Sequence, residues 1–263
     1  MIEIDWVEIP KGEFYLGLSE AQITDMRERI RKGEGLERSI DRKSRIRSVE
    51  ASLQRKKPQR VVWLDTFYIA RFPVTCQQCD AFFAAYPELI DRRIRPKKDA
   101  PDFPEGAPWH IADLFCHWVG GRLPMATEWE KAARGTDQRL YPWGNEWDPS
   151  RGNFTGQHGP GWKTPVDAYP TGASPYGVFD MVGNVVEWTM TITTRHRANT
   201  EGPVVKSNQV KGSSPPYWYY NTVTWYNVLP LYDYSDFIGF RPVKDKWHNK
   251  YWQGFQVPRR VEE

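Results

Sequence analysis

The sequence predicts an α+β fold that is rich in loops, and three observations support this prediction. Short apolar runs near both ends of the chain are typical of strands. Only a few segments have helical spacing, and these segments are short. Residues 141–177 are dense in Gly, Pro, Trp and Asn and are expected to be irregular. A chain of 263 residues is long enough for one large domain or two small ones.

The order of the expected elements follows from these patterns. Capping and stop signals bound two of the helices: Gly120 and Gly121 end one, and a Thr127-x-x-Glu130 capping box opens another, which Gly135 ends. In chain order we expect strands within 2–17 and 61–75, helices at 76–86, 109–119 and 127–134, strands at 178–181 and 185–193, a polar link up to Val210, and a strand around Phe240.

Residues 18–60 differ from the rest of the chain because they are strongly basic. They contain 13 Lys and Arg against 7 Asp and Glu, and no aromatic residue. A Ser19-x-x-Gln22 capping box opens an apolar stripe at helical spacing that begins at Ile23. We expect a basic helical insertion with one face docked on the body. A solvated outer face is favoured over a nucleic-acid or partner patch because acidic residues are interspersed.

The overall composition narrows the functional classes. The net charge of +3 is too small to indicate a nucleic-acid-binding protein. The first residues lack a basic region followed by an apolar run, and no apolar stretch approaches the about 18 residues of a membrane span. We therefore expect a soluble, cytoplasmic protein with no nucleic-acid partner and no membrane partner.

The three cysteines are Cys76, Cys79 and Cys116, and their odd number argues for reduced thiols rather than a disulfide framework. Cys76-x-x-Cys79 supplies half of a zinc site, but the second half is missing and the histidines are scattered singly. We expect the three thiols to act as small buried apolar groups.

The stretch from Tyr217 to Phe237 has the most unusual composition in the chain. Nine of its 21 residues are aromatic, about 43% against 14% for the whole protein, and Lys, Arg, Glu and Gly are absent. Six tyrosine hydroxyls beside Asn, Ser and Asp are costly to satisfy in a core, whereas the same mixture is favourable at a recognition surface. We expect a binding surface; the alternative is an irregular aromatic segment that packs on its own domain.

Short motifs stand in a specific order along the chain. They are Gly12-Glu13-Phe14 with Leu16-Gly17, Pro73-Val74-Thr75, Gly121-Arg122-Leu123-Pro124 with Glu128-Trp129-Glu130, Tyr141-Pro142-Trp143-Gly144-Asn145, Pro165-Val166-Asp167, Gly183-Asn184-Val185-Val186-Glu187-Trp188-Thr189 and Gly239-Phe240-Arg241. Together they resemble the formylglycine-generating-enzyme (sulfatase-modifying factor) family from about residue 5 to 243, apart from the insertion. The resemblance implies a single domain over 1–263 with a C-type-lectin-like fold: small antiparallel sheets, two main helices and long loops.

The resemblance also implies which enzymatic activities to expect. Family members that oxidise a substrate cysteine carry two cysteines shortly before the Gly-Phe-Arg signature, where a thiolate pair binds copper. Between Lys211 and Phe240 this sequence has no cysteine. The related sulfoxide synthases use a histidine-rich iron-binding bundle, and the insertion here has no histidine. We therefore expect a non-enzyme that requires no cofactor.

One metal site is implied by the same resemblance. In the family, calcium lies in loops that match Asn153-Phe154 and residues 182–187, which makes Asn184 and Glu187 candidate ligands of a structural calcium ion. The first loop lacks an expected aspartate, whose place is taken by His158. The alternative is that Asn184 and Glu187 brace the loops through hydrogen bonds to the backbone.

A branch with the same fold is more similar still: the variable proteins of diversity-generating retroelements, in which mutagenesis at adenines rewrites a C-terminal segment displayed on a lectin-like scaffold. Residues 211–241 resemble such a segment, with Trp218 and Trp225 as scaffold positions. We expect a protein ligand, with an altered enzyme and a carbohydrate-binding lectin as alternatives. The expected ligand-binding residues are Tyr217, Tyr219, Tyr220, Asn221, Thr224, Tyr226, Asn227, Tyr232, Asp233, Tyr234 and Asp236.

Overall fold

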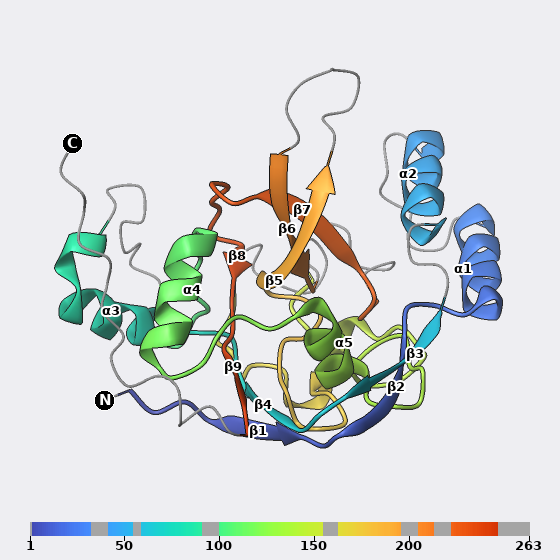
Figure 1. The fold of residues 1–263 in the computed structure, drawn as a ribbon. Coiled ribbons are helices and arrows are strands. Elements are labelled where there is room, and N and C mark those ends of the chain that lie inside the picture. The colour runs from blue at the N-terminus through green and yellow to red at the C-terminus, as the bar shows by residue number, and fades with distance from the viewer. Residues whose placement is uncertain are drawn as a thin grey trace.

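The computed structural model describes residues 2–32, 42–54, 59–90, 100–154, 163–195, 205–212 and 222–246. Strands and helices are short and are joined by long loops (Figure 1). In chain order the elements are β1 (Trp6–Ile9), β2 (Gly12–Leu16), α1 (Glu20–Lys32), α2 (Arg42–Gln54), β3 (Arg60–Leu64), β4 (Phe67–Ala70), α3 (Cys76–Ala85), η1 (Pro87–Leu89), α4 (Trp109–Trp118), α5 (Ala126–Arg134), η2 (Pro149–Arg151), η3 (Pro170–Gly172), β5 (Val186–Arg195), β6 (Val205–Lys211), β7 (Tyr226–Pro230), β8 (Ile238–Gly239) and β9 (Val243–Asp245).

The strands form three small sheets, as expected for a loop-rich α+β fold. Their orders are β1-β4-β9, β2-β3 and β7-β6-β5-β8. All pairs are antiparallel except one: β8 runs parallel to β5, with Val186 opposite Ile238, so the expectation of purely antiparallel sheets is wrong for this pair. The strand β7 lies at the edge of the four-stranded sheet. Because β8 lies at the opposite edge, the segment that joins β7 to β8 crosses from one edge of the sheet to the other.

Among the described residues, the body has the three helices that the sequence patterns predict, α3, α4 and α5, one more than the two main helices that the resemblance implies. Helices α3 and α4 lie on one side of the four-stranded sheet, and their apolar faces pack with β5, β6 and β8 in the first core cluster (Figure 1). Helix α5 packs in a second cluster with β1, β4 and β9, centred on the fully buried Trp129. No described helix has the length and apolar character needed to cross a membrane.

Helices α1 and α2 lie in the basic segment, at the opposite side of the molecule from α3 and α4 (Figure 1). The predicted Ser19–Gln22 capping box is confirmed, because the Gln22 N–H donates to Ser19 Oγ at 3.2 Å and the Ser19 N–H donates to Gln22 Oε1 at 3.0 Å. The apolar stripe that begins at Ile23 packs with Leu53, Leu140 and neighbouring residues in a third cluster. One face of the two-helix insertion is thus fixed to the body.

The capping box predicted for α5 is wrong. The helix begins at Ala126, and the Met125 N–H donates to Glu128 Oε2 at 2.7 Å. Thr127 is therefore inside the helix, and Glu130 is free to serve a different, buried role. Gly135 ends the helix as predicted, with a φ of 70° that favours glycine.

Two assignments between residues 178 and 211 are also wrong. Residues 178–181 form no strand, since Asp180 adopts a left-handed φ of 56°. The expected polar link instead contains β6, which pairs with both β5 and β7. Two polar side chains of β6 are buried and bonded: Asn208 donates to the Thr189 carbonyl at 2.9 Å, and Lys211 donates to Glu130 Oε2 at 2.9 Å. The polar composition of β6 is typical of an exposed segment, but partners that are distant in the sequence satisfy its buried hydrogen-bonding groups.

The three cysteines, all within the described residues, are buried and form no disulfide, as expected for small apolar groups. Burial raises the pKa of the Cys79 and Cys116 thiols well above the usual value, which keeps them protonated. Among the described residues, no three His, Cys, Asp or Glu side chains are arranged to hold a metal ion.

Candidate ligand-binding surface

The candidate ligand-binding surface comprises the described residues 222–237, which contain β7 and the turn that follows it. Tyr217, Tyr219, Tyr220 and Asn221 were expected to contribute but lie outside the described residues. The side chains within the surface differ in exposure. Asn227 is exposed, Tyr232 is 69% exposed, and the half-buried members are Tyr226, Asp233, Tyr234 and Asp236.

Thr224 was expected to point outward, but its side chain is buried, with 3% exposed. Its hydroxyl lies 2.7 Å from the hydroxyl of Thr222, which is also buried. Between them, Val223 is fully buried and its N–H donates to the Leu140 carbonyl at 2.9 Å. These three residues anchor the segment to the body, and their composition alone gives no sign of that role.

The strand β7 and the residue just before it contribute two half-buried side chains to the core. Trp225 and Leu229 pack against the first core cluster, which agrees with a scaffold position for Trp225. Trp218, the other expected scaffold position, lies outside the described residues. The Trp225 N–H donates to the Thr222 carbonyl at 2.8 Å and so orients the start of β7. The exposed Asn227 stands between the two packed side chains.

The turn after β7 is held by short-range bonds and by one close approach. The Asp233 N–H donates to the Pro230 carbonyl at 3.0 Å, and the Tyr234 hydroxyl donates to Asp236 Oδ1 at 3.2 Å. A Cβ placed on Gly106 would lie 2.7 Å from Asp236 Cα, so only glycine permits this approach. The turn thus presents Tyr232 on a locally ordered backbone.

Two buried ion pairs fix the strands on either side of this surface. Lys211, at the end of β6, places Nζ 2.9 Å from Glu130 Oε2. Arg241, just after β8, binds Glu187 through two contacts of 2.6 and 2.7 Å. All four side chains are at most 4% exposed. Both ends of the 211–241 segment are therefore held by charges that solvent does not reach.

Trp129 of α5 links the two ion pairs. Its indole N–H donates to Glu187 Oε2 at 2.8 Å, and Lys211 Nζ lies 5.4 Å from its ring centroid. The sequence placed Trp129 and Arg241 in motifs, Glu187 at a calcium site and Glu130 in a capping box, and it assigned no role to Lys211. No local pattern signals the Lys211–Glu130 pair, because its two members are 81 positions apart.

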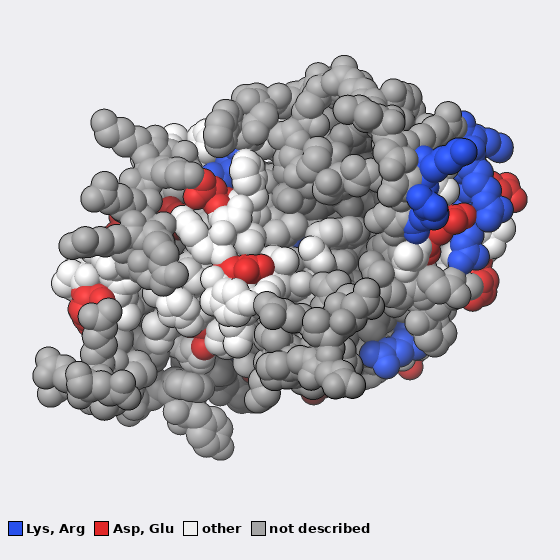
Figure 2. All heavy atoms as spheres, turned by 90° about the horizontal axis from the view of Figure 1, so that it is seen from above, with Lys and Arg blue, Asp and Glu red and all other residues white. Residues whose placement is uncertain are grey.

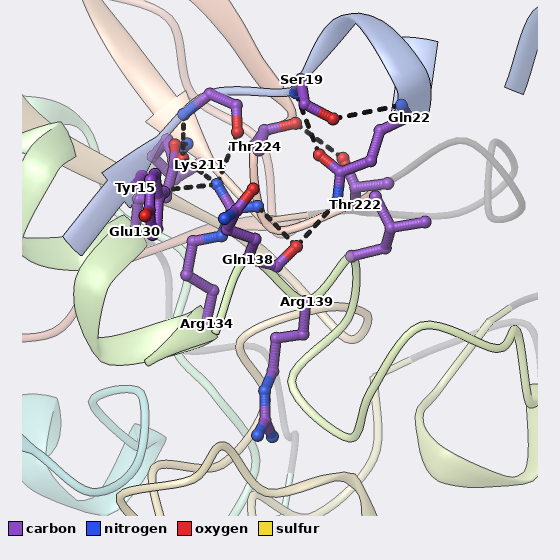
Figure 3. Close-up of polar contacts among 12 residues, drawn as sticks. Tyr15, Ser19, Gln22, Glu130, Arg134, Gln138, Arg139, Lys211, Thr222 and Thr224 are labelled. Carbon is purple, nitrogen blue, oxygen red and sulfur yellow. Dashed lines mark hydrogen bonds and ion pairs between the residues drawn. The ribbon is translucent and has the colours of Figure 1, made fainter. Parts of the chain in front are cut away.

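Glu130 is the centre of a larger network (Figure 3). Besides Lys211, it accepts from Arg134 Nη1 at 3.1 Å and from the Gly17 N–H at 2.8 Å. Burial alone would raise the pKa of Glu130, but Lys211 and Arg134 outweigh burial and hold it below its usual value. Burial lowers the pKa of Lys211, with Glu130 opposing the shift. Because Glu130 has three donors, the ionised carboxylate is the state that the geometry favours.

The candidate calcium ligands are engaged with protein groups. Both carboxylate oxygens of Glu187 face the Arg241 guanidinium, so a cation there would meet a positive charge. The Asn184 side chain bonds the Thr164 N–H at 3.0 Å, the Thr164 carbonyl at 3.0 Å and Asp180 Oδ2 at 2.8 Å. Asn184 braces a loop through the backbone, and Glu187 braces its neighbours through an ion pair. This arrangement does not fit calcium at Glu187.

Asp180, beside Asn184, gives a pH-dependent prediction. Burial raises the pKa of Asp180 from 3.8 to about 7 although Asn184 and Arg241 oppose the shift. The folded state therefore keeps a proton that the unfolded chain loses above about pH 4, so rising pH removes stability up to about pH 7. The difference between these two pKa values corresponds to about 4 kcal/mol in the free energy of unfolding.

We expect Asp180→Asn to remove this loss of stability, because the new amide does not ionise. Its side-chain oxygen can still accept the hydrogen bond from Asn184. Urea unfolding at pH 5 and pH 8 measures the effect: wild type should lose stability relative to the variant as the pH rises. Asp65→Asn, which replaces an exposed carboxyl that does not contribute to the Asp180 shift, is the matched control. Parallel pH profiles for wild type and Asp180→Asn would contradict the prediction.

Comparisons with known proteins agree with this architecture. Residues 4–246 match the profile of the Sulfatase-modifying factor enzyme 1-like domain. The chain is 39% identical over 144 residues to the formylglycine-generating enzyme of Mus musculus, a match that covers 48% of this chain and 38% of that enzyme. The match thus spans well under half the length of that relative.

Two solved structures have the same fold at low sequence identity. PvdO from Pseudomonas aeruginosa superimposes with a TM-score of 0.65 at 21% identity and covers 91% of this chain and 94% of PvdO. Treponema denticola variable protein 1 superimposes with a TM-score of 0.61 at 16% identity and covers 92% of this chain and 95% of the variable protein. These likenesses establish the arrangement of strands and helices.

Proposed function

The chain belongs to the sulfatase-modifying factor enzyme 1-like domain family, and we propose that within this family it is a non-catalytic protein that binds a protein ligand. The observation that carries the proposal is the candidate ligand-binding surface. Tyr232 and Asn227 are exposed there, while buried Thr222 to Thr224 and the ion pairs of Lys211 and Arg241 hold the flanking backbone. Stiff aromatic and amide side chains on a fixed backbone favour recognition because little entropy is lost on binding.

The thiols of the chain support a non-catalytic role. Formylglycine generation is expected to need a thiolate pair near the Gly-Phe-Arg signature, and no cysteine follows Cys116 in the sequence. The three cysteines present are buried, and burial raises the pKa of Cys79 and Cys116, which disfavours the reactive thiolate. These buried thiols are therefore poorly suited to act as a reactive thiolate.

We further propose that this surface is diversified, as in the variable proteins of retroelements. Sequencing the genomic neighbourhood of the gene tests this idea. The expected result is a reverse-transcriptase gene together with a near-repeat of the codons for residues 211–241 that differs only at adenines. If both are absent, the surface is a fixed one, and the diversification proposal fails while ligand binding stays testable.

Binding itself is tested by selection from a phage-displayed library of random twelve-residue peptides. We expect Tyr232→Ala to weaken binding of the recovered peptides about 30-fold, which corresponds to the about 2 kcal/mol of a hot spot. Tyr226→Ala should also weaken binding without altering the fold. Isothermal titration calorimetry measures affinity, and circular dichroism checks folding.

Trp63→Ala is the matched control, since Trp63 on β3 is 59% exposed but belongs to a different sheet. This variant should bind the recovered peptides within about threefold of wild type, because surface substitutions away from the interface have small effects. Equal losses for Tyr232→Ala and Trp63→Ala would contradict the proposed surface. An unfolded Tyr226→Ala protein would instead indicate that this segment packs for stability.

A further inference from the structure

The distribution of charge along the chain is strongly uneven. Residues 18–60 carry 13 Lys and Arg against 7 Asp and Glu, a net charge of +6, whereas the other residues carry 23 against 26, a net charge of −3. Residues 217–237 contain no Lys or Arg but include Asp233 and Asp236. The net positive charge of this protein is thus carried by one segment.

The described part of that segment presents its basic side chains to solvent. Figure 2 shows Lys and Arg gathered over α1 and α2 at one end of the molecule. Lys32, Lys43 and Arg47 are exposed, and within the described ranges none of them forms an ion pair. Arg31 instead pairs with Glu50 at 3.2 Å and ties α1 to α2. We call Lys32, Lys43 and Arg47 the basic helix face.

The insertion and the candidate ligand-binding surface rest on the same short segment of the body (Figure 3). The Gln138 carbonyl accepts from Gln22 Nε2 of α1 at 2.8 Å and from Arg134 at 3.0 Å. Two residues later, the Leu140 carbonyl accepts the Val223 N–H at 2.9 Å, and the Leu140 side chain packs in the cluster of α1 and α2. The first turn of α1 is thereby fixed beside the chain that enters β7.

We propose that the basic helix face is a second contact region of the ligand-binding surface and that it selects protein ligands with an acidic segment. The inference rests on the proposed function, because it specifies the chemistry of the same ligand. Charges at the rim of an interface act mainly on association rate and on partner choice. A ligand long enough to extend from β7 across the first turn of α1 would contact both regions, because Gln22 and Val223 are anchored on the same segment of the body.

An acidic protein fits this surface better than a nucleic acid does. Glu20, Asp25 and Glu28 are exposed on α1, among the basic residues. Asp233 and Asp236 are half-buried members of the candidate ligand-binding surface. A continuous phosphate backbone that covered both regions would meet these carboxylates and be repelled, whereas a short acidic segment of a protein can contact the basic helix face alone.

The test uses a fluorescein-labelled twelve-residue polyglutamate peptide and fluorescence anisotropy at low ionic strength. We expect saturable, salt-sensitive binding to wild type and at least a tenfold loss for Lys43→Glu/Arg47→Glu. The matched control is Lys11→Glu/Lys246→Glu, which makes the same change in net charge at two exposed residues outside the insertion. This control and Tyr232→Ala should each change polyglutamate binding less than twofold.

Three outcomes would overturn the inference: no saturable binding of polyglutamate, an equal loss in both double variants, or tighter binding of a twelve-nucleotide oligothymidylate. The library selection separates this inference from the proposed function. Peptides recovered on wild type should be enriched in Asp and Glu, and those recovered on Lys43→Glu/Arg47→Glu should not. If the recovered peptides require Tyr232 for binding but are not enriched in Asp and Glu, the inference of an acidic ligand is refuted while the proposed function stands.

Discussion

Arg241→Met is expected to lower the free energy of unfolding by about 3–5 kcal/mol, because it leaves the buried Glu187 carboxylate without its cation. Arg241 is fully buried and also donates to the carbonyls of Ala70, Arg71 and Phe179 at 3.1, 3.2 and 2.8 Å. The substitution therefore removes a bridge between β4, the loop before β5 and β5 itself. Urea unfolding at pH 7 measures the loss.

The control for this prediction is Arg151→Met. Arg151 pairs with Asp148 at 2.9 Å, but both side chains are more than a third exposed, so the loss should stay below about 1 kcal/mol. Glu187→Gln added to Arg241→Met should recover part of the stability because it removes the isolated charge. A full loss that the second substitution leaves unchanged would show that the backbone contacts of Arg241, not its ion pair, dominate.

Glu130→Gln is expected to cost about 3–5 kcal/mol as well, for the opposite electrostatic reason. It leaves Arg134 and Lys211, which are 0% and 2% exposed, as two buried cations without an anion. Lys211→Met in the Glu130→Gln background should recover stability, since one of the two uncompensated cations is gone. The matched control is Glu146→Gln, at an exposed carboxyl, with an expected change within about 0.5 kcal/mol.

The Glu130→Gln variant should also respond to pH. The pKa of Lys211, already lowered by burial, should fall further once Glu130 no longer opposes the shift, so the loss of stability in the variant shrinks as the pH rises toward the pKa of free lysine. A loss that grows as the pH rises would contradict the assignment of this charge.

If residues 222–237 are diversified as proposed, the position of these ion pairs would explain how one scaffold tolerates the changes. Lys211 and Arg241 stand at the two ends of the segment, and their partners Glu130 and Glu187 belong to α5 and β5. We expect a substitution at Tyr232 to leave each pair intact. The stability of the fold and the chemistry of the surface would then change independently.

Local sequence patterns determined the features that depend on neighbouring residues. The Ser19–Gln22 capping box, the end of α5 at Gly135 and the irregular 141–154 loop follow from side chains within a few positions of one another. The ordered motifs likewise predicted the family, because seven short matches in sequence order do not arise from composition. The exposure of Tyr232 and Asn227 agrees with the recognition-type composition of the 217–237 stretch.

Only the tertiary structure decided which polar residues are buried. Thr224 is an anchor rather than a surface residue, and β6 is a central strand despite its polar sequence. Lys211 lies 81 positions from Glu130, and Arg241 lies 54 positions from Glu187. A charged side chain is stable in a core only when its partner is there, and no pattern within one segment records a partner brought by another. The sequence by itself therefore determined the family and predicted a binding surface in the 217–237 stretch, whereas the folded chain decided what holds the described part of that stretch in place.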